Sequence, residues 1–288
     1  MEEHEARKWL AALPAQLQAQ RRIMERLLDL CLARPAARVF LVGCSIGRGA
    51  ADELSDVDCF VGCRPDGVGE VVAGVRAILP EMGELVDALE HPYKGLTRIV
   101  GQFSGCVQLD LVVGPAHPGR APDEVVLFDP DGLMTTDRVV SADIVTAATV
   151  REWAFLGWEA LADVAKYLRR GSAWEALARL DEARGWIWAL WAAARRARYP
   201  VFGLSQVLDR DPGDLPAGIE ATVAGLDPAG LRAAAAASGT VLEQVSAFAA
   251  QVHGGTLPDA LARHVTALLQ SAGAPDERPS TLTRPASR

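Results

Sequence analysis

Residues 43–58 read Gly-Cys-Ser-Ile-Gly-Arg-Gly-Ala-Ala-Asp-Glu-Leu-Ser-Asp-Val-Asp, and they connect two short apolar runs, at 39–42 and 59–61. Because alternate residues of a strand point to the same face, the carboxylates of Asp56 and Asp58 can both meet one cation. The small-residue turn before them would open a helix, whose backbone N–H groups and positive dipole end favour an anion. An anion site beside a divalent-cation site is typical of phosphoryl or nucleotidyl transfer. We therefore place the candidate active site in this stretch.

A third carboxylate lies in the strand predicted at 106–113, where Asp110 stands alone among apolar neighbours. Burying a single carboxylate is unfavourable unless a metal ion or a partner compensates its charge. If this strand lies beside the one that follows Asp56 and Asp58, the three carboxylates meet at one edge of the sheet. Such oxygen ligands suit Mg²⁺, which also binds substrate phosphates. In the alternative interpretation, Asp110 lies on a solvated face and pairs with Arg98 of the neighbouring strand.

The first 140 residues predict a sheet with helices. Apolar spacing indicates a helix over 2–32, interrupted or kinked at Pro14, and a second helix over 67–79. The predicted strands are 39–43, 57–62, 84–90, 96–103, 106–113 and 124–129, with a hairpin turn at Ser104-Gly105.

The second half of the chain shows helical periodicity throughout. The predicted helices are 143–170, 172–198, 216–224, 228–236, 239–252 and 257–271, with Ser172 as the cap of the second. The stretch at 273–288 is rich in Pro, Ser and Thr and predicts a disordered tail. The predicted class is α+β: a mixed β-sheet domain at 1–140, an all-α helical bundle at 141–272, and the tail.

Composition and charge limit the classes of partner. Half of the residues are hydrophobic and 23% are charged, as in an ordinary globular chain. No apolar run approaches the roughly 18–20 residues that span a bilayer, and the acidic N-terminus is unlike a signal peptide, so we expect a cytoplasmic protein without a membrane partner.

The net charge of −8 is concentrated in residues 1–140, which carry 14 basic and 21 acidic side chains. An acidic surface disfavours a polyanionic partner, which argues against a template-directed polymerase or a tRNA-modifying enzyme. It suits a cationic small substrate. Alternatively, the charge only keeps the protein soluble.

The stretch resembles the signature of the polymerase-beta-like nucleotidyltransferases, which is Gly-Ser, a short helical turn, Gly, and then Ser-Asp-x-Asp. The residues at matching positions are Ser45, Gly49, Ser55, Asp56, Asp58 and, on a later strand, Asp110. The resemblance covers residues 39–113. The order of a sheet domain and a helical domain is similar to that of the antibiotic nucleotidyltransferases, which modify aminoglycosides or lincosamides.

This resemblance implies a role for each candidate residue. Asp56 and Asp58 would bind Mg²⁺, and Asp110 would complete a second metal site or accept the proton of the acceptor hydroxyl. A nucleoside triphosphate, most simply ATP, would be held by Gly43, Cys44, Ser45, Arg48, Gly49, Ser55 and, from the helical domain, Lys166. For Arg48 and Lys166 the alternatives are a surface guanidinium and a solvated helix end.

One residue departs from the signature. Cys44 stands where the motif has its first glycine, and Gly43 lies one position earlier. If the turn requires a positive φ at this position, a Cβ atom there is unfavourable. A turn shifted by one residue would let Gly43 take that conformation instead.

The predicted function is Mg²⁺-dependent transfer of a nucleoside monophosphate, AMP, to a hydroxyl of a small molecule such as an aminoglycoside or lincosamide. We expect the acceptor to bind in a cleft between the sheet domain and the helical domain, which holds six of the seven Trp between 153 and 191. The alternative is that most of these Trp residues belong to the core of the helical domain. We expect a monomer or a homodimer. Two alternatives stay open: nucleotidylation of a protein partner, as in antitoxin-like members of the superfamily, and a nucleotide-binding module without turnover.

Overall fold

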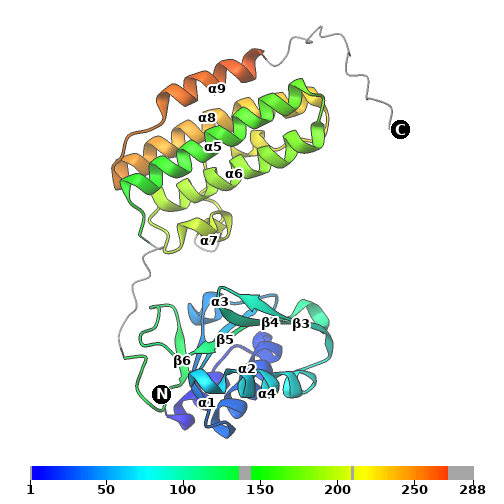
Figure 1. The fold of residues 1–288 in the computed structure, drawn as a ribbon, viewed down its shortest axis with the longest axis vertical. Coiled ribbons are helices and arrows are strands. Elements are labelled where there is room, and N and C mark those ends of the chain that lie inside the picture. The colour runs from blue at the N-terminus through cyan, green and yellow to red at the C-terminus, as the bar shows by residue number, and fades with distance from the viewer. Residues whose placement is uncertain (1, 136–143, 209–210, 272–288) are drawn as a thin grey trace, which may run out of the picture. The chain divides into compact units, whose positions relative to one another are not determined.

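The polar stretch at 43–58 connects the first two strands of a six-stranded sheet and ends within the second of them, in the computed structural model of the chain (Figure 1). The structure describes residues 2–135, 144–208 and 211–271. The chain divides into two compact units, Met1–Val139 and Val140–Arg288. The predicted boundary between residues 140 and 141 and the predicted tail at 273–288 lie outside the described residues.

The sheet of the first unit has the strand order β3-β4-β5-β2-β1-β6. Its strands are β1 Ala37–Val42, β2 Val57–Cys63, β3 Leu85–Tyr93, β4 Leu96–Phe103, β5 Gln108–Pro115 and β6 Val125–Phe128. β2 and β5 run parallel, and every other neighbouring pair is antiparallel. The sheet is therefore mixed, and together with the helical second unit it confirms the predicted α+β class.

Three helices cover one face of this sheet (Figure 1). They are α1 Glu3–Ala11, α2 Gln18–Ala33 and α4 Val68–Ile78, and the chain breaks between α1 and α2 at Pro14, as the sequence predicts. A pyrrolidine ring cannot continue a helix interior because it lacks the N–H donor. The strands turn every second side chain toward these helices, such as Val57 and Val61 of β2 and Leu109 of β5.

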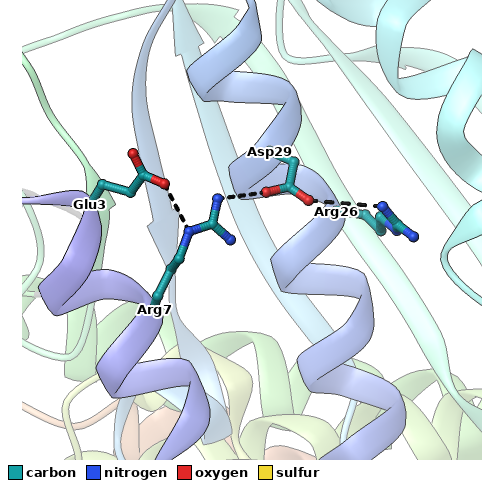
Figure 2. Close-up of polar contacts among 4 residues, drawn as sticks. All are labelled: Glu3, Arg7, Arg26 and Asp29. Carbon is teal, nitrogen blue, oxygen red and sulfur yellow. Dashed lines mark hydrogen bonds and ion pairs between the residues drawn. The ribbon is translucent and has the colours of Figure 1, made fainter.

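Exposed ion pairs join α1 to α2 (Figure 2). The guanidinium of Arg7 donates to Glu3 at 2.8 Å within α1 and to Asp29 of α2 at 2.9 Å, and Arg26 lies 3.9 Å from the same Asp29 carboxylate. Solvated pairs of this kind contribute little individually, so the buried apolar face carries the packing of α1 on α2.

The second unit is helical. Its elements are α5 Ala147–Arg169, α6 Ala173–Ala194, α7 Leu204–Leu208, the 3₁₀ turn η7 Ile219–Thr222, α8 Pro228–His253 and α9 Asp259–Ser271. The long helices α5, α6 and α8 share one apolar core, and α9 packs on α5 and α8. Ser172 stands at the position before α6, but its hydroxyl contacts the Glu175 carboxylate and accepts no backbone N–H, so the predicted cap is wrong in this respect.

Two helix predictions for this unit are wrong. The helix predicted at 216–224 is only the turn η7, and the helices predicted at 228–236 and 239–252 form the single helix α8. The predicted gap is at residues 237–238, directly before Gly239. In α8 the Ser238 hydroxyl donates to the Ala234 carbonyl one turn earlier in the same helix, at 2.8 Å. Gly239 packs closely on Trp158 of α5, and this tertiary contact compensates its weak helix propensity.

No helix in the described ranges is both long enough and apolar enough to cross a bilayer.

The role of Gly239 predicts a contrast between two glycine substitutions. A Cβ atom at Gly239 would lie 3.3 Å from the Trp158 ring, whereas one at the exposed Gly185 of α6 would meet nothing within 4 Å. Gly185→Ala should therefore raise the free energy of unfolding by about 0.5–1 kcal/mol, the usual gain in a helix interior. Gly239→Ala should gain less or destabilise the protein. Circular dichroism during thermal unfolding measures both, and equal stabilisation would contradict close packing at Gly239.

Candidate active site

The sheet brings the three predicted carboxylates to one face. Asp58 of β2 and Asp110 of β5 are register partners in the parallel pair, so their side chains lie on the same side, opposite the face that the helices cover. Asp56 lies directly before β2. The negative charge of Asp110 interacts with Asp56 and with Asp58 and raises the pKa of each carboxyl group. The juxtaposition follows from the pairing of two strands that are far apart in the sequence.

The electrostatics of this face are unfavourable in the isolated chain. Burial raises the pKa of Asp58, and the charges of Asp110 and Asp56 raise it further, while a hydrogen bond from Cys44 lowers it. Burial and the charge of Asp110 also raise the pKa of Asp56. Negative charge is thus gathered where the protein compensates it incompletely, an arrangement that a cation would relieve.

A guanidinium holds the third carboxylate. Nε of Arg98 on β4 donates to Oδ1 of Asp110 at 2.7 Å, and Nη2 donates to Oδ2. The ion pair between Asp110 and Arg98, which the sequence offered as an alternative, is therefore present. It occurs on the same face as the three carboxylates and does not replace their gathering. In the described parts of the chain, no group of three or more His, Cys, Asp or Glu side chains is arranged so that it could hold a metal ion.

The donor chemistry of Asp56 and Asp58 fits Mg²⁺, because both side chains offer only oxygen ligands and both have a raised pKa that a divalent cation would counter. Asp110 differs, since Arg98 engages both of its oxygens. The residues present therefore fit a magnesium ion bound by two carboxylates, with the third held by an arginine.

The small-residue turn is anchored beside β2. The short helix α3 Cys44–Gly47 starts two residues after β1, and the N–H of Gly43 donates to the Asp58 carbonyl at 2.9 Å. Ser45 lies in α3 and is half-buried, and Gly49 follows with a φ of 70°. Sequence reasoning missed Gly47: a Cβ atom there would lie 2.1 Å from the Asp123 carbonyl oxygen, so only glycine fits.

Cys44 takes the left-handed conformation that favours glycine. Its φ is 51°, whereas Gly43 has extended backbone, so the alternative of a turn shifted onto Gly43 is wrong. Burial and the adjacent Asp58 carboxylate raise the pKa of the Cys44 thiol to about 12. The thiol therefore stays protonated and can donate its hydrogen bond to Asp58.

Arg48 lies beside these groups. Its positive charge lowers the pKa of both Cys44 and Asp58, and its Nη1 lies 3.7 Å from a carboxylate oxygen of Asp123, whose side chain is only 8% exposed. Arg48 is thus part of the same site, and Asp123 is a second residue that the sequence analysis did not identify. Asp123 is 65 residues after Asp58 in the chain, and no local pattern marks it.

A buried glutamine positions the loop before Asp56. The side chain of Gln20 on α2 is fully buried, and its Nε2 donates to the carbonyls of Glu53 and Ser55 at 3.0 Å each. The Ser55 hydroxyl donates to Asp52 and accepts from its N–H, which closes a turn. Ser55 therefore shapes the loop. Gln20 could have been found from the sequence, because it is a polar residue at an apolar position of the helical repeat.

Lys166 belongs to the second unit. It lies in the last turn of α5, where its ammonium contacts the Asp163 carboxylate and lies 4.7 Å from the centre of the Tyr167 ring. Its role toward a triphosphate stays a prediction. Among the tryptophans of this unit, Trp153 and Trp158 are buried in the core, while Trp174 is 73% exposed.

No protein-family model and no curated protein matches the sequence. Among solved structures, the chain is similar to the crystal structure of an aminoglycoside 6-adenyltransferase from Bacillus subtilis. The two chains are 14% identical, with a TM-score of 0.41, and the match covers 90% of this chain and 99% of the other. A similarity at this level does not indicate a function for this chain.

The conformation of Cys44 predicts a difference between two variants that both lack the thiol. Cys44→Gly should be more stable than Cys44→Ala by about 1 kcal/mol, because only alanine keeps a Cβ atom at a positive φ. Urea unfolding of the two proteins measures this difference. Both variants lose the hydrogen bond to Asp58, so its loss does not contribute to the difference between them. An alanine variant at least as stable as the glycine variant would contradict the left-handed conformation.

The raised pKa of Asp58 predicts a pH-dependent gain in stability for Asp58→Asn. Folding disfavours the charged form, so the wild type loses stability relative to the variant as the pH rises from the ordinary value of 3.8 through the higher folded-state pKa. At neutral pH, with a metal chelator present, the variant should be the more stable protein. Below the ordinary pKa the difference should vanish, because the carboxyl is then protonated in both the folded and the unfolded state.

Urea unfolding at a series of pH values measures this effect. Asp66→Asn is the matched control, because the Asp66 side chain is 81% exposed and lies outside the site. A stability difference for Asp58→Asn that does not change with pH would exclude its charge as the cause.

Proposed function

We propose that this protein transfers AMP from ATP, with Mg²⁺, to a hydroxyl group of a small molecule. The observation that carries the proposal is the register pairing of Asp58 with Asp110, with Asp56 beside them and the turn of α3 hydrogen-bonded to the Asp58 backbone. Carboxylates for a divalent cation and a turn for phosphates then lie next to each other. That combination serves the positioning and charge stabilisation on which nucleotidyl transfer depends.

Each residue of the site receives a role in this proposal. Asp56 and Asp58 bind the metal ion, which when bound would neutralise the charge that develops on the phosphates. The backbone of the turn and the Ser45 hydroxyl hold the terminal phosphates, and Arg48 supplies positive charge beside them. Asp110 accepts the proton of the acceptor hydroxyl or completes a second metal site.

The charge of the first unit supports a cationic acceptor. Residues 1–140 carry seven more acidic than basic side chains, which favours association with a polyamine over association with a polyanion. Aminoglycosides are polyamines that carry many hydroxyl groups. They are therefore the first acceptors to test, followed by lincosamides.

One pair of observations favours a second candidate, a nucleotide-binding module without turnover. Cys44 places a side chain at the left-handed position of the turn, and Arg98 engages Asp110. Both features would weaken catalysis more than they would weaken binding of a nucleotide. The two candidates differ in whether pyrophosphate is released.

Pyrophosphate release from ATP and Mg²⁺, measured with a panel of aminoglycosides and lincosamides, tests the proposal. We expect pyrophosphate release with at least one acceptor. Asp56→Asn and Asp58→Asn should each lower the rate of release by more than about 100-fold, because each replaces a negatively charged ligand of the metal ion by a neutral amide. Asp66→Asn, on the exposed surface of the same unit, should react like the wild type.

Calorimetric titration with a non-hydrolysable ATP analogue separates the two candidates. Nucleotide binding without pyrophosphate release, for every acceptor tested, would support the binding module. A protein that neither binds the nucleotide analogue nor releases pyrophosphate would refute both candidates. Mass spectrometry of proteins incubated with the enzyme and ATP would detect an added nucleotide if the acceptor is a protein.

A further inference from the structure

Building on the proposed function, we infer that Arg98 is an internal counter-cation that competes with a divalent metal ion for Asp110. In the metal-free protein Arg98 neutralises the third carboxylate. Asp110 joins the metal site only when its contact with Arg98 is broken. The arginine thereby controls how many carboxylates the site offers to a metal ion.

The position of Asp110 carries this inference. Asp110 lies between neighbours of opposite charge on the face of the sheet away from the helices. On one side is Asp58, its register partner in β2. On the other side is Arg98 of β4, whose register partner Val112 follows two residues after Asp110 and so lies on the same face. Both neighbours are set by the backbone pairing of the sheet.

The contact between Arg98 and Asp110 is of a kind that a metal ion would have to displace. Two guanidinium nitrogens donate to the two oxygens of Asp110, and this two-point arrangement fixes the plane of the carboxylate. Mg²⁺ requires near-octahedral oxygen ligands at about 2.0–2.1 Å, and a carboxylate whose two oxygens are already held by a guanidinium is not free to turn into that geometry. A metal ion bound to Asp58 and Asp110 would also place two cations next to each other.

The contact can nevertheless open. The side chains of Arg98 and Asp110 are 32% and 24% exposed, and partly solvated ion pairs contribute modestly to stability. The guanidinium of Arg98 also lies 5.6 Å from the centre of the Tyr93 ring, a distance typical of cation–π contacts. When Asp110 is lost as a partner, Arg98 retains this second contact, so opening does not leave its charge without a neighbour.

Affinity for Mn²⁺, measured without nucleotide on the metal-free full-length protein, tests this inference. Electron paramagnetic resonance of unbound Mn²⁺ gives the dissociation constant. Arg98→Gln should bind Mn²⁺ about tenfold more tightly than the wild type, the change expected from removing a competing contact of ordinary strength. Arg98→Lys should lie between the two, because it keeps the charge and loses the two-point contact.

Two further variants make the test specific. Arg76→Gln is the matched control, because Arg76 forms an exposed ion pair with Glu90 in the same unit and its removal changes the net charge equally. Its Mn²⁺ affinity should equal that of the wild type. In the double variant Arg98→Gln, Asp110→Asn, the gain should disappear, because Asp110 supplies the added ligand.

The outcomes separate this inference from the proposed function. An Arg98→Gln variant that binds Mn²⁺ no more tightly than the wild type overturns the role of Arg98, even if the wild type releases pyrophosphate. Tighter binding that is lost with Asp110→Asn supports it, even if no acceptor is modified. Equal gains in Arg98→Gln and Arg76→Gln would overturn it, since net charge alone would then be the cause.

Discussion

The parallel pairing of β2 with β5 is the constraint on which the candidate site depends. It sets Asp58 opposite Asp110, although 51 residues separate them in the chain. The same pairing turns Val57 and Leu109 into the core under the helices, so the hydrophobic effect that stabilises the sheet also fixes the carboxylates on its other face. A slip of one residue in this register would turn the carboxylates toward the helices and the apolar side chains to the opposite face.

The site concentrates charge at a cost in stability. Burial and mutual repulsion raise the pKa of Asp56 and Asp58, and the nearby cations Arg48 and Arg98 compensate only part of this charge. A fold selected for stability alone would not gather three carboxylates on a half-buried face. The arrangement is understandable if a cation and a phosphate-bearing ligand supply the missing compensation, as the proposed function requires.

The loop between β1 and β2 is held by contacts from other parts of the first unit. Gln20 reaches from α2 to two of its carbonyls, the Asp123 backbone packs on Gly47, and the Asp58 carbonyl accepts from Gly43. These contacts fix the loop strongly enough for Cys44 to keep a left-handed backbone, which costs a non-glycine residue about 1–2 kcal/mol. The surrounding fold therefore positions the loop, and the loop tolerates Cys44 at a position where glycine would be more favourable.

By itself, the sequence determined the α+β class, the order of strands and helices in the first unit, and the three carboxylates, because apolar periodicity and the spacing of Asp56 and Asp58 are local properties of the chain. Local patterns failed where tertiary contacts outweigh propensity, as in α8, which continues through Gly239 because that residue packs on Trp158. Only the tertiary structure decided that Asp110 meets both Asp58 and Arg98, and that Gln20, Gly47 and Asp123 support the turn. These contacts join residues distant in the chain, and their partners follow from strand register and helix packing, which no short stretch of sequence encodes.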